Sequence, residues 1–372
     1  EPTAVLSPPE VQELWRVLRR LTDEGGTVVL ITHKLDEVIE ISRNITVMRA
    51  GETVGRLVTA TASPNDIAHL MVGRDVRLAG ELVEEAAMAR DGAVRAEGAP
   101  DSGAERPGAP VPALSVTDLV VGSSRNPREV DGISFDVRPG EVLGIAGVEG
   151  NGQTELVEAI AGLRRPSHGS IRMGSREVTM LSVRERADAG LSHIPEDRLR
   201  RGLVLDYSVS DNLILGLQHR FSERGVLSGE RVQRNADERI AEFDVRPADR
   251  TLPAHALSGG NQQKVVLARE MRGREFSVLL ASQPTRGVDV GAIEFIHAQL
   301  RAARDAGKAV LLVSADLVEV LALADRVAVM YEGKIVASLA RGEATKESVG
   351  CFMTGATRTG NTGEMPTPDR KA

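Results

Sequence analysis

Short apolar runs alternate with stretches of helical spacing over residues 113–357 of the chain. The stretch 154–163 carries Leu156, Ile160 and Leu163 on one helical stripe, whereas the apolar runs have the length of buried strands. This alternation predicts an α/β domain with a largely parallel sheet. The expected strands cover residues 112–121, 132–137, 142–147, 277–282 and 309–314.

The pattern of residues 1–54 returns without a gap in residues 283–336, at a constant offset of 282. Fifteen of the 54 aligned positions are identical, against roughly 6% expected by chance. The chain therefore contains the end of one domain and, later, a whole copy of the same domain. The alignment also places a strand immediately before His33, because the preceding apolar run falls on 309–314. We expect the first half of the first domain to precede residue 1.

The repeat and the composition together divide the chain into four parts. Residues 1–76 form the C-terminal part of a first domain, and 113–357 form a complete second domain. Between them, 77–112 is rich in Ala, Gly, Pro and Glu and has no aromatic residue, which is typical of a flexible linker. The polar tail 358–372 is expected to be disordered.

Composition and charge restrict the class of protein. The 372 residues are 41% hydrophobic and 27% charged, which is typical of a soluble globular chain. The net charge of −7 argues against a partner such as nucleic acid, which is bound through a basic face. Cys351 is the one cysteine, so an internal disulfide is excluded and a reducing cytoplasmic setting fits. No apolar run approaches the roughly 18–20 residues of a membrane span.

A glycine-rich loop follows the apolar run 142–147. Phosphate-binding loops have the pattern G-x-x-x-x-G-K-[ST], in which backbone N–H groups and a helix N-terminus cradle phosphate. Gly147, Gly152 and Thr154 match it, with Gly150 and Asn151 between them, but Gln153 occupies the lysine position. The alternative is an ordinary glycine turn between a strand and a helix.

A second candidate anion site lies at 256–271, where a serine and two glycines precede a helix. A hydroxyl and bare glycine amides at a helix N-terminus favour negatively charged ligands. A simple helix N-cap by Ser258 is the alternative, but the segment is more specific than a cap requires. Its residues are Leu257, Ser258, Gly259, Gly260, Asn261 and Gln262.

These motifs together resemble the nucleotide-binding domains of ABC transporters, over residues 1–76 and 113–357. The segments "GVEGNGQTEL", "IPEDR", "LSGGNQQK" and "QPTRGVDVGAIEFIH" are most similar in sequence to those of tandem ATPase subunits of bacterial importers of simple sugars and nucleosides. The resemblance implies the P-loop NTPase fold with a mostly parallel sheet. It also implies ATP and Mg²⁺ as cofactors and a peripheral location on the cytoplasmic face of the membrane. The implied partners are two transmembrane permease subunits and, through them, an extracytoplasmic substrate-binding protein.

In this family two domains pair head to tail, and each ATP lies between the phosphate loop of one domain and the LSGG segment of the other. The resemblance assigns Glu1 to the catalytic glutamate position of the first domain and His33 to the histidine that contacts the γ-phosphate. A buried histidine after a strand is the alternative for His33. Thr154 would contact magnesium in the second domain.

The second domain departs from the family pattern at several positions. Gln153 replaces lysine, Ser282 replaces the magnesium-binding aspartate, Gln283 replaces the catalytic glutamate and Ala315 replaces the histidine. Glu196 stands where these domains usually carry a glutamine. The resemblance therefore implies one site that hydrolyses ATP and a second, degenerate site that at most holds it.

Two other functions remain open from the sequence. The first is a soluble ABC ATPase with a role outside transport, although the chain shows neither the helical arm nor the basic face usual in such proteins. The second is a non-catalytic, nucleotide-binding interaction module, which the degenerate second site favours.

Overall fold

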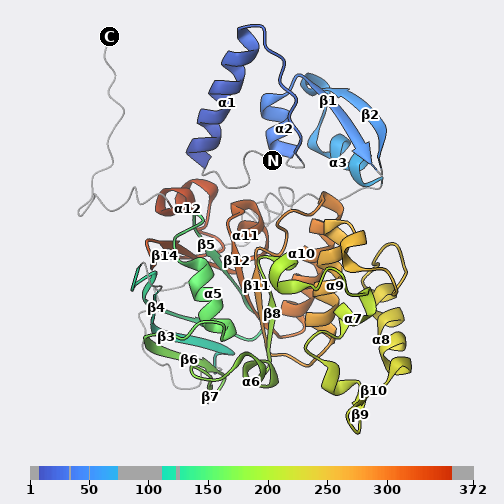
Figure 1. Cartoon of the computed structure of the whole chain (residues 1–372). Helices are drawn as coiled ribbons and strands as arrows, with labels where there is room; N and C mark the ends of the chain where they lie inside the picture. The colour runs from blue at the N-terminus through green and yellow to red at the C-terminus, as the bar shows by residue number, and fades with distance from the viewer. Residues whose placement is uncertain (1–7, 33–34, 50, 74–110, 123–125, 354–372) are drawn as a thin grey trace, which may run out of the picture.

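The computed structural model describes residues 8–32, 35–49, 51–73, 111–122 and 126–353 (Figure 1). Glu1, His33, the tail 358–372 and nearly all of the expected linker lie outside these residues. Inside them, a large α/β unit begins at residue 111, and a smaller unit covers residues 8–73.

A six-stranded sheet forms the centre of the large unit, in the order β14-β13-β5-β12-β11-β8. Every neighbouring pair from β13 to β8 is parallel, and only β14 is antiparallel to its neighbour. Every residue of β5, β11 and β12 is buried, as expected for apolar strands covered on both faces. The predicted α/β fold with a mostly parallel sheet is therefore confirmed. The strands are β5 (Val142–Ala146), β8 (Leu191–Ile194), β11 (Val278–Ser282), β12 (Ala309–Ser314), β13 (Arg326–Tyr331) and β14 (Lys334–Ala340).

A second, antiparallel sheet with the order β4-β3-β6-β7 covers one side of the large unit. Helix α5 (Gln153–Ala161) packs between the two sheets, where Leu156 and Ile160 are fully buried. The expected third member of this stripe, Leu163, is half exposed, because the helix ends at Gly162. The strands of this sheet are β3 (Leu114–Val121), β4 (Val130–Val137), β6 (His168–Met173) and β7 (Arg176–Glu177).

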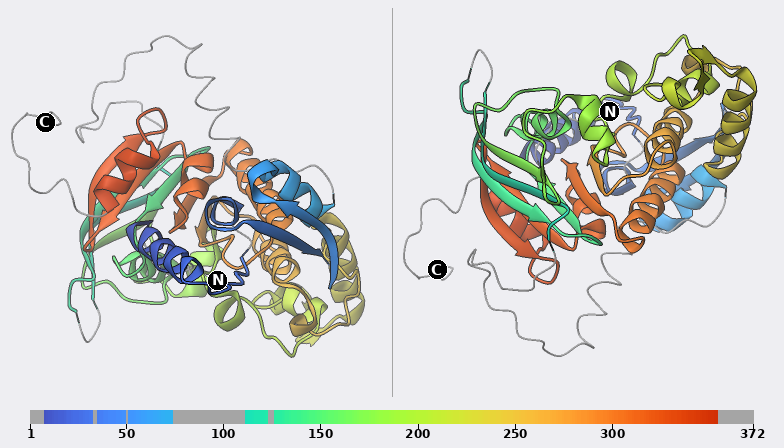
Figure 2. Two further views of the ribbon diagram at one scale, coloured as in Figure 1. Left: turned by 90° about the horizontal axis from the view of Figure 1, so that it is seen from above. Right: turned by 90° about the horizontal axis from the view of Figure 1, so that it is seen from below.

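Helices cover the opposite face of the central sheet, and the largest apolar core lies between them and the strands. From above and below, the antiparallel sheet and α8 lie at opposite sides of this unit (Figure 2). A short hairpin, β9 (Ser222–Glu223) and β10 (Val226–Leu227), precedes α8. Besides α5, the α-helices of this unit are α6 (Val183–Asp188), α7 (Val209–Leu213), α8 (Gly229–Glu242), α9 (Gly259–Arg272), α10 (Val290–Asp305), α11 (Leu317–Leu323) and α12 (Lys346–Met353).

The smaller unit repeats elements of the large one at the offset found in the sequence. Its elements are α1 (Pro8–Asp23), α2 (Leu35–Ile41), β1 (Asn44–Arg49), β2 (Glu52–Val58) and α3 (Pro64–Val72). Adding 282 to the bounds of the first four gives the bounds of α10, α11, β13 and β14. Leu35, Ile45, Val47 and Ile67 form a small core that also contacts Val290 at the start of α10.

The strand that the repeat predicts before His33 is absent from residues 27–32. Val29 and Ile31 are 84% and 80% exposed there, whereas the aligned residues Leu311 and Val313 are buried in β12. A parallel strand needs hydrogen-bonding neighbours, and β12 has β5 and β11. The described residues around 27–32 include no such neighbours, so this expectation was wrong for the structure.

Candidate functional site

The glycine loop 147–154 joins the carboxyl end of β5 to the start of α5. Gly152 has a positive φ of 98°, and a Cβ there would lie 2.2 Å from the carbonyl oxygen of Glu129. Only glycine fits this position, which lets the chain turn directly into the helix. The N-cap of α5 is Gly152, which has no side chain to cap the helix, and the N-terminal N–H groups of a helix favour an anion.

Gln153 folds back over its own loop. Its Nε2 donates a hydrogen bond to the carbonyl oxygen of Val148 at 3.0 Å, and its Oε1 is buried without a hydrogen-bond partner. The side chain also covers Gly147, where a Cβ would lie 2.3 Å from Nε2. The residue in the lysine position therefore contributes neither a charge nor an outward donor.

Asn151 fixes the loop to the turn between β13 and β14. Its Oδ1 accepts a hydrogen bond from the Glu332 N–H at 2.9 Å, and its carbonyl oxygen accepts one from Gly333 at 3.1 Å. Its Nδ2 donates to Val148 within the loop. These contacts hold the loop backbone against the β13-β14 turn, in addition to the hydrogen bond that Gln153 makes within the loop.

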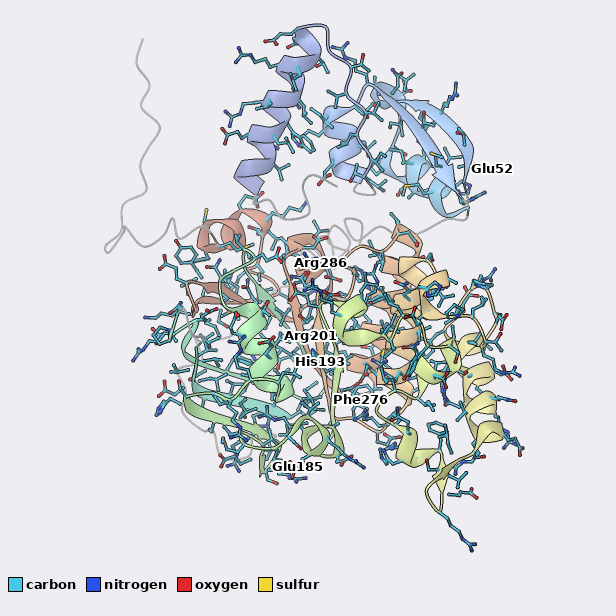
Figure 3. The ribbon with its side chains drawn as sticks, viewed as in Figure 1. Glu52, Glu185, His193, Arg201, Phe276 and Arg286 are labelled. Carbon is cyan, nitrogen blue, oxygen red and sulfur yellow. The ribbon has the colours of Figure 1, made fainter. Side chains whose placement is uncertain are left out.

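Thr154, the expected magnesium contact, belongs to a chain of polar side chains. Its Oγ1 donates to Glu196 Oε2 at 3.2 Å, and the other oxygen of Glu196 accepts from Arg286 Nη1 at 2.7 Å. Arg286 Nη1 also lies 3.3 Å from Glu149 Oε1 in the glycine loop. Figure 3 shows Arg286 and Phe276 at opposite ends of the central sheet. Arg286 follows the carboxyl end of β11, and Phe276 precedes its amino end.

Negative charge is concentrated around this loop. Burial, followed by the charge of Glu129, raises the pKa of Glu155 in the first turn of α5. Glu149 and Glu196 share a single guanidinium, that of Arg286. No group of three or more His, Cys, Asp or Glu side chains in the described residues could hold a metal ion by itself. A divalent cation here would therefore need ligands from a bound phosphate in addition to Thr154 and Glu196.

The second glycine motif forms the N-terminus of α9. Ser258 is the N-cap, and its Oγ accepts from the N–H and Nδ2 of Asn261. A Cβ on Gly259 or Gly260 would lie 2.7 Å from Arg198 or 2.8 Å from Asp289. Leu257 and Gln262 are buried and support the segment from behind. The capping role of Ser258 is therefore real, but the two glycines are there because of close packing, which a cap does not require.

Arg198 of the "IPEDR" segment connects the two motifs. Its guanidinium donates to the carbonyl oxygens of Arg286 at 2.6 Å and Gly287 at 3.1 Å, and reaches Gln262 Oε1 at 3.4 Å. The loop 283–289 is thus held between α9 on one side and, through the Arg286 side chain, the glycine loop 147–154 on the other.

The structure brings together two of the degenerate positions. Gln283, which has a positive φ of 45°, accepts a hydrogen bond from the Ala315 N–H through its Oε1 at 3.2 Å. Ser282 is buried at the end of β11. The described residues near this pair therefore present an amide and a methyl group where the resemblance predicts a carboxylate and an imidazole.

Sequence reasoning missed Arg286, Arg198 and Glu149. One signal for Arg286 was present, since the repeat aligns it with Ala4. The roles of Arg198 and Glu149 depend on contacts between segments far apart in the chain, which no spacing rule reveals.

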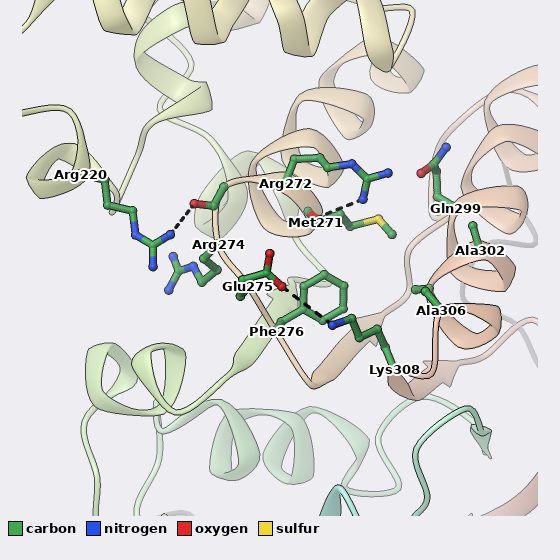
Figure 4. A pocket seen from close by; sticks show the side chains of 12 residues that line it. Arg220, Met271, Arg272, Arg274, Glu275, Phe276, Gln299, Ala302, Ala306 and Lys308 are labelled. Carbon is green, nitrogen blue, oxygen red and sulfur yellow. Dashed lines mark hydrogen bonds and ion pairs between the residues drawn. The ribbon is translucent and has the colours of Figure 1, made fainter.

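A cavity of about 370 Å³ lies at the amino ends of the strands β11 and β12 (Figure 4). Three of its cations are already paired: Arg220 with the Gly273 carbonyl oxygen, Arg272 with Glu242, and Lys308 with Glu275. Ligands of open α/β sheets bind at the carboxyl ends of the strands. The cavity is therefore separate from the phosphate loop.

A strand, a glycine loop and an uncapped helix, together with a Ser-Gly-Gly helix start, define a nucleotide-binding domain of the P-loop class. The model of the ABC transporter family matches residues 130–286. The chain belongs to this family and has the fold of its ATP-binding cassettes. Within the described residues, no helix is both long and apolar enough to cross a membrane.

Curated relatives match nearly the whole chain. It is 41% identical over 357 residues to the nucleoside import ATP-binding protein NupA of Lactococcus lactis subsp. cremoris, covering 95% of this chain and 66% of that protein. It is 41% identical over 360 residues to the guanosine import ATP-binding protein NupO of Bacillus subtilis (96% and 66%). It is 40% identical to the ribose import ATP-binding protein RbsA 1 of Streptomyces avermitilis (94% and 61%). The chain thus spans slightly less than two thirds of the length of these relatives.

Solved structures support the same fold. A nucleotide-free ATP-binding cassette from an ABC transporter aligns with a TM-score of 0.54 at 21% identity, covering 64% of this chain and 93% of that one. A dimeric cassette in a post-hydrolysis state, bound to ADP and phosphate, aligns with a TM-score of 0.53 at 20% identity, covering 62% of this chain and all of that one.

Proposed function

We propose that this chain is part of the ATP-binding and ATP-hydrolysing subunit of an ABC importer for nucleosides or simple sugars, with two unequal nucleotide sites. The import functions named for the relatives support the transport role. The observation that carries the inequality is the loop 147–154, in which Gln153 is turned inward and supplies no charge.

The loop backbone and the start of α5 bind the phosphates of ATP in the second site. Thr154 and Glu196 contribute oxygen ligands to the Mg²⁺ that accompanies it, since both are adjacent to the loop and magnesium prefers oxygen. Bound magnesium neutralises phosphate charge. The second site holds ATP without hydrolysing it, because the amide of Gln283 cannot accept a proton near neutral pH.

Hydrolysis takes place in the first site. Glu1 polarises the attacking water and His33 contacts the γ-phosphate, as the family resemblance assigns them. Ser258, Gly259 and Gly260 of the second domain complete this site by closing over the ATP of the first domain. Their close packing at the start of α9, in a domain whose own phosphate loop carries Gln153, supports this head-to-tail arrangement.

The partners of the whole protein are two permease subunits in the membrane and, through them, an extracytoplasmic substrate-binding protein. The preceding half of the first ATPase domain is a further partner, which would supply the intact phosphate loop. Mounted on the permeases, the subunit lies peripherally at the cytoplasmic face of the membrane. The permeases and the binding protein select the transported substrate.

Calorimetric titration of this chain with ATP and Mg²⁺ tests the proposed site. We expect weak, saturable binding, and a loss of affinity in Thr154→Val, because that change removes a hydroxyl and preserves the volume. Thr117→Val is the matched control, since Thr117 is an exposed threonine on β3, away from the loop. Absence of binding by the unmodified chain, or equal affinity in the two variants, would reject the site.

A phosphate-release assay tests whether ATP is hydrolysed in the first nucleotide site and not in the second. We expect negligible ATPase activity from this chain alone, because the only phosphate loop it contains lies beside Gln283 and Ala315. Turnover near ~1 s⁻¹, the low end of ordinary enzyme rates, would show that the second site is catalytic. Co-purification of the whole protein with two permeases tests the transport role.

A further inference from the structure

The second nucleotide site lacks a cation on the loop itself. Gln153 is neutral and its amide is turned into the loop. Glu149 and Glu196 add two carboxylates close to where phosphates would bind. A triphosphate would meet net repulsion in this region unless another residue supplied positive charge.

Arg286 is the cation that reaches this loop. Its Nη1 lies 2.7 Å from Glu196 and 3.3 Å from Glu149, and Glu196 is itself hydrogen-bonded to Thr154. Nη1 is the only guanidinium nitrogen of Arg286 with a hydrogen bond to a described residue. A guanidinium presents five donors, so Nε and Nη2 retain capacity for a phosphate while Nη1 holds a carboxylate.

The backbone beneath Arg286 is held in place. Arg198 donates to the carbonyl oxygens of Arg286 and Gly287, and the Arg286 N–H donates to the Gln283 carbonyl oxygen at 3.1 Å. The guanidinium therefore extends from a fixed point, which reduces the entropy lost when it binds a ligand.

The two copies of the repeat differ in charge at the position of Arg286. Arg286 aligns with Ala4, in the copy that retains the glutamate and histidine of an intact site. The copy with Gln153 therefore has an arginine at a position where the other copy has alanine. Loss of the lysine and presence of the arginine occur in the same site, and the structure brings the two positions to the same loop.

We infer that Arg286 takes the place of the missing lysine and binds the nucleotide phosphates at loop 147–154. The inference rests on the proposed nucleotide site. Glu149 and Glu196 hold the guanidinium beside the loop until nucleotide binds, and its unpaired donors then bind phosphate oxygens. Arg286 acts in binding and takes no part in bond cleavage.

The rival role for Arg286 is purely structural: it would only neutralise Glu149 and Glu196 and keep the loop folded. The two roles predict different effects of Glu196→Gln. If Arg286 binds phosphate, Glu196→Gln releases its guanidinium from a competing carboxylate. ATP affinity, measured in EDTA without magnesium, then stays equal or rises. If Arg286 only stabilises the loop, Glu196→Gln removes the ion pair on which that stabilisation depends. ATP affinity then falls, as it does in Arg286→Ala.

The main experiment measures ATP affinity of the chain by calorimetry with and without Mg²⁺. We expect Arg286→Ala to weaken binding roughly 10- to 100-fold, as for loss of a charged hydrogen-bond donor. Arg165→Ala is the matched control: Arg165 is exposed, and the change removes the same charge from the domain. We expect its affinity to remain within about twofold of the unmodified chain.

A double-mutant cycle with Gln153→Lys separates phosphate binding from folding. If Arg286 replaces the lysine, Gln153→Lys raises affinity and reduces the loss caused by Arg286→Ala to a fewfold effect. A loss that is unchanged in the lysine background, or an Arg286→Ala variant that binds as tightly as Arg165→Ala, overturns the inference while the proposed function stands. No saturable ATP binding by the unmodified chain would instead reject the proposed function.

Discussion

The two copies of the repeat have nearly the same local elements and very different surroundings. Helix α1 corresponds to α10, α2 to α11, and the hairpin β1-β2 to β13-β14, each with the same bounds after the offset. The one element present in only one copy is the strand β12, whose counterpart at 27–32 has no regular secondary structure and is mostly exposed. Helices and hairpins satisfy their hydrogen bonds locally, whereas a strand in a parallel sheet depends on distant segments.

The first and largest test of this comparison is amide hydrogen exchange. Residues 309–314 form a strand that is hydrogen-bonded to a neighbouring strand on each side, so their amides should exchange only when the domain unfolds. The amides of 27–32 should exchange almost as fast as in an unfolded chain. The expected ratio is at least about 10³, given the usual free energy of global unfolding. Equal protection in the two segments would contradict the comparison. In a longer protein that includes the preceding half-domain, protection at 27–32 should rise.

The second test compares His33 with its aligned residue Ala315. In the whole protein assembled with permeases, His33→Ala should reduce the ATPase rate ~10²–10³-fold, as for loss of a transition-state donor. Ala315→His should leave the rate almost unchanged, because Ser282 and Gln283 still occupy the positions of the acidic residues. Ser258→Ala should also slow hydrolysis, although it lies in the degenerate domain. A severalfold gain in Ala315→His, or no effect of Ser258→Ala, would overturn the proposed pairing of sites.

The third test uses one aligned position in two environments. Leu311→Ala should lower the free energy of unfolding by about 2–5 kcal/mol, because Leu311 is fully buried in β12. Val29→Ala should change it by less than about 0.5 kcal/mol, since Val29 is 84% exposed. Denaturant titration of the chain measures both. A large effect of Val29→Ala would show that 27–32 is packed in solution.

The fourth test concerns His193 on β8, a strand with no counterpart in residues 8–73. Burial lowers the pKa of His193 to about 4, and its Nε2 has no hydrogen-bond partner. The unfolded chain therefore binds more protons between pH 6.5 and 4, so the free energy of unfolding should fall by about 1–3 kcal/mol as pH drops through this window. His193→Gln should remove this part of the pH dependence. Denaturant titrations at several pH values compare the two slopes.

Much of the candidate site was predictable because its motifs are local. Gly147, Gly152 and Thr154 lie within eight residues, and Ser258 directly precedes the helix that it caps. The inward turn of Gln153 was not predictable, since it depends on the rotamer that the loop admits. The place of Arg286 was not predictable either, because it reaches Glu149 and Glu196 from a segment about a hundred residues away.

The sequence by itself determined the repeat, the α/β class, the glycine motifs and the residues that differ from the family pattern in the second domain. These depend on periodicity, on glycine and on neighbours within a few residues. The tertiary structure alone decided which apolar run became a strand. Val29 and Leu311 share one sequence pattern, but only Leu311 has strands on both sides with which to exchange backbone hydrogen bonds. It also decided that Arg286 pairs with Glu149 and Glu196, because an ion pair is set by distance in space rather than by distance along the chain.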